Sequence, residues 1–296
     1  MRVLVTGATG FVGSAVVQEM LANGHDVVGL ARSDDGAAIL EKTGADVLRG
    51  TIQDLDLLRD AAAKADGVIH TAFNHDFSKF AQNSEDDRAA IEVLGSALEG
   101  SSRPLLATSG LALLASGRAA TEADTLPASK DFPRQSEAAT LCVAARGVNA
   151  TLIRLPPTTH GKGDHGFVPT LIKIARETGK AAYIGDGENR WAAGHRLDAA
   201  RLYRLALEHG AKDGPFHAAA EEGIAMKRIA TLIGEQLNLP VVSLSPEEAQ
   251  AHFGIFAMFV GMDMRGSAAR TRETLGWEPT QPELLTDMVE NGYFDA

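Results

Sequence analysis

Cysteine, basic residues and long apolar runs are all scarce in this chain. Its one cysteine, Cys142, excludes a disulfide within the chain, and its apolar neighbours predict a small buried side chain in a reducing compartment. The 28 Lys and Arg against 39 Asp and Glu give a formal net charge of −11, which disfavours nucleic-acid binding. Residues 254–262 form the longest later apolar stretch, which is too short to span a bilayer, and glycines interrupt the apolar N-terminal run. We therefore expect a cytoplasmic protein without a secretion signal, a membrane partner or a nucleic-acid partner.

The apolar residues that are present follow an alternating pattern of strands and helices. Strands without polar alternation are typical of a parallel sheet that is covered on both faces. Predicted strands comprise residues 2–6, 26–31, 46–49, 67–72, 104–108 and 149–155. Predicted helices between them comprise residues 12–23, 55–65, 86–98 and 136–146. This βαβ repetition predicts an α/β fold with a doubly wound parallel sheet.

The second half has a different pattern, without repeats or low-complexity linkers. Helices are predicted at 167–177, 197–208 and 226–237, strands at 215–219 and 241–244, and a polar loop at 185–194. Residues 252–262 are apolar nearly all round, which predicts a buried helix in a core, over a substrate or at a partner surface. These elements suffice for a small second lobe packed on the first.

Three glycines at regular spacing follow the first predicted strand and open the first predicted helix. Gly7 allows a tight turn, Gly10 lets the backbone approach a pyrophosphate, and Gly13 lets the helix pack closely on the strand. The N–H groups at the start of such a helix face the bound anion. The order of strand, turn and helix favours a dinucleotide site over plain turns. We therefore assign residues 1–158 and 195–220 to a dinucleotide-binding Rossmann domain, and residues 159–194 and 221–296 to a smaller C-terminal α/β substrate lobe.

The segment from Thr6 to Gly13 resembles the start of the short-chain dehydrogenase/reductase superfamily, in its extended (epimerase/dehydratase-like) and atypical branches. The resemblance continues at the ends of the later strands and at the acidic helix start around Asp198. It implies further cofactor contacts, which comprise Thr9, Phe11, Val12, Asp54, Leu55, Thr71, Ala72, Phe73, Leu155 and Pro156.

The end of the second predicted strand bears on the choice of cofactor. An NAD site uses a carboxylate there to accept from the ribose 2′-hydroxyl, whereas an NADP site uses an arginine to meet a 2′-phosphate. Arg32 and Ser33 occupy this position, and the acidic residues come only afterwards. This favours NADP(H) as the cofactor, with NAD(H) as the alternative, although a surface arginine is also the ordinary fate of this residue type.

The superfamily's usual catalytic pair, a Tyr and a Lys four residues later, is absent. The chain has three tyrosines, Tyr183, Tyr203 and Tyr293, and none is followed by a lysine at that spacing. In the usual alignment Pro133 stands in place of the Tyr and Glu137 in place of the Lys. Glu137 is predicted to accept hydrogen bonds from ribose hydroxyls. The alternative is that Ser136 and Glu137 only start a helix, with Ser136 as the cap and Glu137 favoured by the helix dipole.

Other polar residues are candidates to replace the missing acid. Thr108 and Ser109 end the fifth predicted strand, Ser136 lies in the segment that should carry the pair, and His160 follows the sixth strand. These four are the predicted catalytic residues. Predicted substrate contacts are His75, Tyr183, Arg190 and Trp191. The nearby histidines and Asp164 match no zinc spacing, so no metal is predicted.

The variant motif, with the downstream segments 154–157 and 189–191, resembles an atypical subgroup of aldehyde-reductase-like proteins. The resemblance implies NAD(P)-linked carbonyl chemistry. Together with Arg32 it predicts an NADPH-dependent reductase of a small aldehyde or ketone with a non-standard proton relay, and we expect a monomer or homodimer. The alternative is a non-catalytic NADP(H)-binding sensor that has lost its chemistry with its Tyr and Lys. An epimerase or dehydratase would need an acid/base pair that the sequence does not place.

Overall fold

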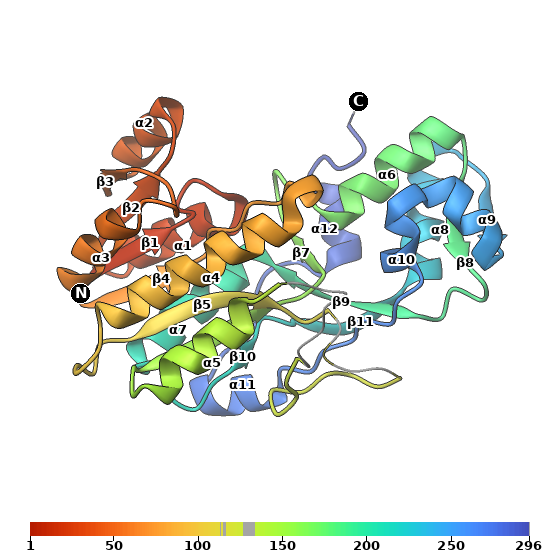
Figure 1. Cartoon of the computed structure of the whole chain (residues 1–296). Helices are drawn as coiled ribbons and strands as arrows, with labels where there is room; N and C mark the ends of the chain where they lie inside the picture. The colour runs from red at the N-terminus through yellow and green to blue at the C-terminus, as the bar shows by residue number, and fades with distance from the viewer. Residues whose placement is uncertain (113, 115–116, 127–133, 296) are drawn as a thin grey trace.

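A computed structural model describes residues 1–112, 114, 117–126 and 134–295. Its first lobe contains a seven-stranded sheet (Figure 1). The strands are β1 (Arg2–Thr6), β2 (Asp26–Ala31), β3 (Asp46–Arg49), β4 (Gly67–His70), β5 (Leu105–Gly110), β6 (Ala150–Leu155) and β10 (Phe216–His217). The helices of this lobe are α1 (Phe11–Ala22), α2 (Asp34–Thr43), α3 (Leu55–Ala63), η1 (Phe77–Lys79), α4 (Phe80–Ser96), α5 (Ser136–Ala145), α7 (Arg196–Glu208) and α11 (Ala269–Leu275).

All strand pairs of the large sheet are parallel, in the order β10-β6-β5-β4-β1-β2-β3. The strand order reverses between β1 and β4, so the carboxyl ends of these two strands form a topological switch point. This confirms the predicted doubly wound α/β sheet. The α2 helix is an element that the sequence analysis did not predict, and β4 ends two residues before its predicted end.

Alternate residues of β1 face two separate apolar layers. Val3 and Val5 join α1, α2 and α7 in one core cluster, whereas Leu4 joins α3, α4 and α5 in another. The helices of each layer pack on one another, α1 on α7, α3 on α4 and α4 on α5. Because both faces of the sheet are covered, its strands lack polar alternation, as the sequence showed.

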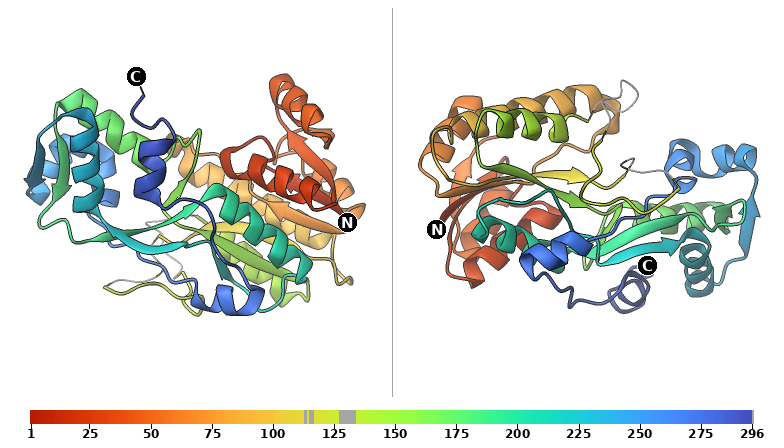
Figure 2. Two further views of the ribbon diagram at one scale, coloured as in Figure 1. Left: turned by 180° about the vertical axis from the view of Figure 1, so that it is seen from behind. Right: turned by 90° about the horizontal axis from the view of Figure 1, so that it is seen from below.

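The second lobe holds two smaller sheets, shown from two further sides in Figure 2. One contains β7 (Thr158–His160), β9 (Arg190–His195) and β11 (Glu221–Ala225), and the other pairs β8 (Ala181–Ile184) with β12 (Val241–Leu244). The surrounding helices are α6 (Phe167–Thr178), α8 (Met226–Leu237), α9 (Pro246–Phe253), η2 (Gly254–Phe256), α10 (Ala257–Val260) and α12 (Leu284–Glu290). Among the described residues, no helix is long and apolar enough to cross a membrane.

Three predictions from the sequence were wrong in local structure. Residues 190–195 form β9 rather than a polar loop, because Trp191 and Ala193 lie in the core of the second lobe and Ala192 in a core cluster of the first. The apolar stretch 252–262 is a broken set of short helices, not one buried helix: Gly254 has a φ of +56°, and Ile255 is 84% exposed. Cys142 is exposed rather than buried, because it lies on the outer side of α5.

The chain returns to the first lobe after building the second. α11 packs against β10, and its Thr271 hydroxyl accepts a hydrogen bond from the His217 backbone N–H at 2.8 Å. The indole N–H of Trp277 donates to the Asp198 carbonyl at the start of α7, at 2.9 Å. Part of the predicted substrate lobe therefore contacts the large sheet, and the domain bounds remain a prediction.

Candidate cofactor and substrate site

The turn between β1 and α1 leaves no room for side chains at two of its glycines. Gly7 has a φ of +66°, and a Cβ atom there would lie 2.7 Å from the Thr71 hydroxyl. A Cβ atom on Gly13 would lie 2.0 Å from the Gly7 carbonyl oxygen. Gly10 caps the helix without a side-chain hydrogen bond, and the first turn contains no acidic residue. The N–H groups at the start of α1 are therefore available to an anion, as a pyrophosphate site requires.

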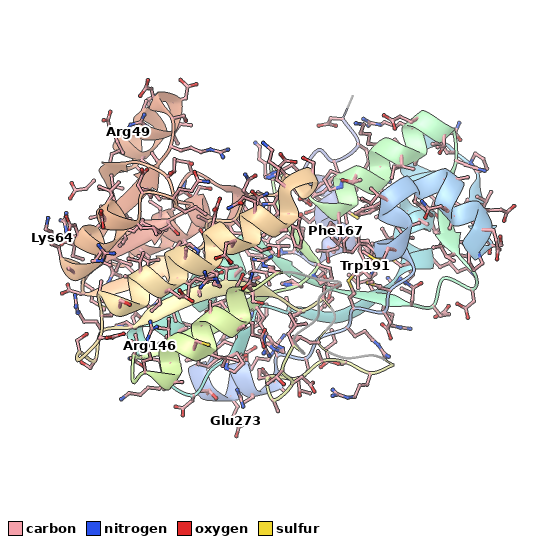
Figure 3. All side chains as sticks on the ribbon, in the orientation of Figure 1. Arg49, Lys64, Arg146, Phe167, Trp191 and Glu273 are labelled. Atoms are coloured by element: carbon pink, nitrogen blue, oxygen red, sulfur yellow. The ribbon has the colours of Figure 1, made fainter. Side chains whose placement is uncertain are left out.

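The loop after β2 presents Arg32, for which the described part of the chain provides no polar partner. Arg32 is exposed and has no hydrogen bond or ion pair within the described part of the chain. Ser33 caps α2 by accepting from the Gly36 N–H at 3.2 Å. Arg49, at the end of β3 (Figure 3), donates to the carbonyls of Ala31 and Ser33 and pairs with Asp34 at 2.7 Å. A second guanidinium therefore flanks the position where a 2′-phosphate would lie, and it neutralises the nearest carboxylate.

The remaining residues predicted to touch the cofactor follow the carboxyl edge of the sheet. Asp54 precedes α3 and accepts from the backbone N–H and hydroxyl of Thr51 at 2.7 and 3.0 Å. Thr71, just past β4, donates its hydroxyl to the Thr6 carbonyl at 2.7 Å. The others lie in the β1–α1 turn and helix start, at the start of α3, just past β4 and around the end of β6, and comprise Thr9, Phe11, Val12, Leu55, Ala72, Phe73, Leu155 and Pro156.

A buried polar network converges on Asp87 of α4. The Ser136 hydroxyl donates to Asp87 Oδ2 at 2.5 Å, and His70 Nε2 lies 3.0 Å from Asp87 Oδ1. His70 Nδ1 is 2.7 Å from the Thr6 hydroxyl, and Ser136 Oγ in turn accepts from Arg134 Nε at 3.1 Å. Thr6, His70, Asp87 and Ser136 are each at most 1% exposed. Two chains of hydrogen bonds therefore end at the Asp87 carboxylate. In one, Arg134 donates to Ser136, which donates to Asp87; in the other, Thr6 donates to His70, which donates to Asp87. These bonds fix the side chains of Ser136 and Arg134.

Arg134 lies at the carboxyl end of β5 and is only partly covered. Its guanidinium donates to the Thr108 carbonyl at 3.4 Å and stands 4.2 Å from the centre of the Phe73 ring. The His75 ring contacts the same phenylalanine edge-on at 5.3 Å. Loss of solvent lowers the pKa of His75, and the positive charges of Arg134 and His165 lower it further. Arg134 is therefore a cation held at this edge of the sheet, beside a His75 ring that its charge helps to keep neutral.

The hydroxyl of Thr108 is directed into the first lobe. It lies 2.7 Å from the His70 carbonyl oxygen, to which it donates, and 2.6 Å from the hydroxyl of Tyr203, which donates to it. Tyr203 is fully buried in α7, and burial raises the pKa of its phenol well above the usual range. Ser109 makes a weak hydrogen bond to Glu137 at 3.5 Å. The protons of the Thr108 and Ser136 hydroxyls are thus both committed to internal acceptors.

Glu137 forms a buried ion pair with Arg154 of β6. Their side chains are 4% and 1% exposed. Arg154 donates through both Nη2 and Nε, and the carboxylate also accepts from the Leu126 N–H at 3.2 Å and from Ser109. A carboxylate offers about four lone-pair sites, so these donors occupy it fully. Glu137 thus anchors α5 to β5 and β6, and the predicted ribose contact stays a prediction. Pro133, which aligns with the missing tyrosine, lies outside the described residues.

The buried His217 extends this ion pair. Arg154 Nη1 lies 3.2 Å from His217 Nε2, and His217 Nδ1 lies 2.8 Å from the Ser267 carbonyl oxygen. This arrangement suits a neutral ring with its proton on Nδ1. Burial lowers the pKa of His217 to about 4, and the charge of Arg154 acts in the same direction while Glu122 opposes it.

His160 is held inside the second lobe by the C-terminal helix. Its Nδ1 donates to Asp287 Oδ2 at 2.8 Å, and its ring meets His195 edge-on at 5.3 Å. Burial opposes ionisation of Asp287, but the hydrogen bond and charge of His160 outweigh it, so the pKa of Asp287 stays below its usual range. His160 is 1% exposed. Its observed role is therefore to fix the loop after β7.

Three of the predicted substrate contacts lie within the second lobe. Trp191 is fully buried, and its ring centre lies 5.4 Å from that of Phe167 (Figure 3). Tyr183 of β8 packs under Lys227, whose Nζ is 5.7 Å from the ring centre. Arg190 is exposed and pairs with Glu188 at 3.7 Å. The structure thus brings together His75 and the carboxyl-edge residues, but places these three residues among second-lobe partners.

Sequence reasoning missed several residues that shape this edge. Arg134 has little signal because it lies between the positions of the missing Tyr and Lys, and nothing in the sequence of α4 marks Asp87 as buried. Arg49 had a usable signal: it ends a strand that pairs with β2, so parallel register places it beside the loop of Arg32.

The sequence is similar to those of known proteins over most of its length. Residues 3–219 match the sequence profile of the NAD dependent epimerase/dehydratase family. An uncharacterized protein of Schizosaccharomyces pombe is 48% identical over 296 residues, which cover 99% of this chain and 100% of that protein. A 4-hydroxy-2-methyl-3-oxo-4-farnesyl-3,4-dihydroquinoline-1-oxide ketoreductase of Stigmatella aurantiaca is 25% identical over 86% of this chain and 80% of its own length.

Solved structures show the same fold at low identity. A double mutant of the dTDP-glucose 4,6-dehydratase of Streptomyces venezuelae, solved with NAD bound, matches with a TM-score of 0.75 at 19% identity, over 99% of this chain and 96% of that one. This likeness supports the fold, while the sequence profile covers more than half of the chain. The chain therefore belongs to the NAD-dependent epimerase/dehydratase family, and it is an oxidoreductase of the extended short-chain dehydrogenase/reductase type that uses a nicotinamide dinucleotide.

Proposed function

We propose that this protein is an NADPH-dependent reductase that transfers a hydride to the carbonyl carbon of a small aldehyde or ketone. The observation that carries the proposal is the position of Arg134. Its guanidinium is held by Ser136, Thr108 and the Phe73 ring at the carboxyl end of β5. Ligands of open parallel sheets bind outside this edge. A fixed cation there suits a reaction in which a carbonyl oxygen becomes negatively charged.

The preference for NADPH is supported by the charges around β2. Arg32 has no partner among the described residues, and Arg49 holds the Asp34 carboxylate at 2.7 Å. An NAD site would instead need a free carboxylate at the end of this strand. Arg32, Ser33 and Arg49 would hold the 2′-phosphate, and the N–H groups at the start of α1 would hold the pyrophosphate.

Arg134 takes the place of the missing tyrosine as a binder of the carbonyl oxygen. NADPH, when bound, supplies the hydride and leaves as NADP⁺. The guanidinium of Arg134 donates to the carbonyl oxygen and stabilises the alkoxide that forms there, and its planar donors suit this charge. Arginine does not give up its proton at working pH, so the alkoxide takes its proton from water. The product is the alcohol.

The residues predicted to be catalytic act, in this proposal, as positioning residues. The hydroxyl of Ser136 accepts from Arg134 and is fixed by Asp87, and the backbone of Thr108 accepts from the guanidinium. Ser109 and His160 stabilise the ends of their strands through Glu137 and Asp287. Support for carbonyl chemistry also comes from the relative that is described as a ketoreductase.

The test is NADPH oxidation by the purified protein against a panel of aldehydes, ketones and imines. Arg134→Gln is expected to lower kcat by about 10²- to 10³-fold, the range found for the loss of one oxyanion donor, with little change in NADPH affinity. Arg134→Lys keeps the charge and should recover part of the rate. Arg146→Gln is the matched control, because Arg146 caps the other end of α5 and pairs with Glu99 at the surface.

Two results would count against the proposal. Equal kcat values for the wild type and Arg134→Gln would remove Arg134 from the chemistry. Tight NADPH binding with no turnover across the whole panel would overturn the reductase function and leave a cofactor-binding sensor.

A further inference from the structure

Arg196 reaches from the start of α7 to the glycine turn of the first lobe. Its Nη1 donates to the Phe11 carbonyl at 3.4 Å, and its guanidinium carbon is 4.9 Å from the centre of the Phe11 ring. Phe11 is the first residue of α1. The stem of Arg196 is held by close backbone packing: Gly161 has a φ of +133°, and a Cβ atom there would lie 3.2 Å from Arg196 Cγ. Gly161 therefore lies close against the stem of Arg196, and the Phe11 carbonyl and ring hold its guanidinium.

This placement is electrostatically unfavourable without an anion. The N-terminus of a helix carries partial positive charge, so it attracts anions and repels a cation. The first turn of α1 contains no acidic residue, and Gly10 provides no side-chain cap. Within the described residues, Arg196 has no ion-pair partner, although the protein has a net charge of −11. An anion would be favoured beside Arg196 at this end of the helix, and within the described residues no carboxylate pairs with it.

A second residue of the loop after β7 contacts the same phenylalanine. The His165 ring meets the Phe11 ring edge-on at 5.7 Å. His165 is exposed, and its Nδ1 lies 3.4 Å from the Gly163 carbonyl oxygen. His165 and Arg196 come from segments on either side of β8 and β9, yet both meet at the first residue of α1. An arginine and a histidine thus both contact the first residue of α1, next to the N–H groups at the start of this helix.

We propose that Arg196 is a ligand of the cofactor pyrophosphate. The N–H groups of its guanidinium that do not bind the Phe11 carbonyl donate to a pyrophosphate oxygen, and its charge adds to that of the α1 terminus. The pyrophosphate is common to NADPH and NADH, so Arg196 strengthens the binding of both. Arg32, at the other end of the adenosine, distinguishes between them. The two arginines therefore act on different phosphates of one ligand.

The experiment compares binding of NADPH, NADH, ADP-ribose and adenosine 2′-monophosphate by calorimetry. Arg196→Gln should weaken NADPH, NADH and ADP-ribose by about 10- to 100-fold, the range of a charge-assisted hydrogen bond, and leave adenosine 2′-monophosphate unchanged. Arg32→Gln should show the opposite pattern, with losses for NADPH and adenosine 2′-monophosphate only. Arg196→Lys should restore part of the affinity. The matched control is Arg201→Gln on the same helix, since Arg201 donates to the Glu278 carbonyl.

Thermal unfolding separates a ligand role from a structural one and does not depend on turnover. Arg196→Gln should change the Tm of the cofactor-free protein little, because the loss of its contacts with Phe11 is offset by the removal of a positive charge from the helix end, and should reduce the rise in Tm on adding NADPH. A lower cofactor-free Tm with wild-type NADPH and NADH affinities would overturn the proposal. A loss confined to NADPH and adenosine 2′-monophosphate would do the same, because it would place Arg196 at the 2′-phosphate.

Discussion

Replacing Glu137 by glutamine removes one charge from the buried pair with Arg154. The guanidinium then stays at 1% exposure without a counterion, beside the buried His217 ring. Breaking a buried ion pair in this way costs about 3–5 kcal/mol of unfolding free energy. Because domains are stable by only about 5–15 kcal/mol, this is a large share of the total. A chain of this size should lose roughly 5–15 °C in Tm.

Urea denaturation followed by circular dichroism measures this loss, and NADPH fluorescence titration measures the affinity of the folded variant. The matched control is Glu85→Gln, since Glu85 pairs with Arg88 at the surface, with side chains 46% and 33% exposed. An exposed pair contributes about 0–1 kcal/mol, so the control should keep its stability. Adding Arg154→Met to Glu137→Gln should recover part of the loss, because it removes the unpaired charge.

The opposite outcome would refute this reasoning. If Glu137→Gln lost less than about 1 kcal/mol and bound NADPH ten times more weakly, the carboxylate would be serving the ribose and not the fold.

Three further predictions follow from burial and backbone geometry. Gly13→Ala should abolish NADPH binding, because its Cβ atom would lie 2.0 Å from the Gly7 carbonyl oxygen. The control Gly261→Ala should bind NADPH normally, because the nearest atom to its Cβ, the Ala257 carbonyl oxygen, is 3.6 Å away. Equal NADPH affinities of the two variants in calorimetry would contradict this prediction. The depressed pKa of His217, about 4 against an ordinary 6.5, lets the unfolded chain bind a proton that the folded chain excludes, so stability should fall as pH drops from about 6.5 to about 4. Urea midpoints across this range should depend less on pH in His217→Gln, and an unchanged slope would argue against the assignment. Exposed Cys142 should react with Ellman's reagent in the folded protein, and labelling only after denaturation would show that it is covered.

The parallel sheet and the glycine turn were predictable because both depend on local sequence. Strands covered on both faces lose their polar alternation, and the turn at Gly7 and Gly13 tolerates no side chain, so each leaves a visible mark on neighbouring residues. The second lobe was harder, because β9 contains small residues whose burial depends on partners far along the chain. Trp191 pairs in register with Ile224 and is covered by Phe167, and neither contact has a signal in the local sequence.

The residue types near the carboxyl edge of the sheet were predictable from the sequence, and their roles stay a prediction. Ser136, Thr108 and Glu137 do gather near the carboxyl edge of the sheet, as strand order implies. Their hydrogen-bond partners decide what they do, and these partners, Asp87 and Arg154, come from other elements. A sequence shows that a hydroxyl or a carboxylate is present, but its lone pairs are assigned only when the fold brings donors to it.

The final helix has a consequence for engineering. Asp287 of α12 binds His160, which precedes it by 127 residues, and the nearby Tyr293 accepts from the Gly161 N–H at 3.1 Å. The loop that carries His165 is thus shaped by a distant part of the chain. Libraries that aim to change cofactor affinity or substrate range should diversify α12 together with this loop. A loop transplanted from a relative should keep its shape only when the matching terminal helix is transplanted with it.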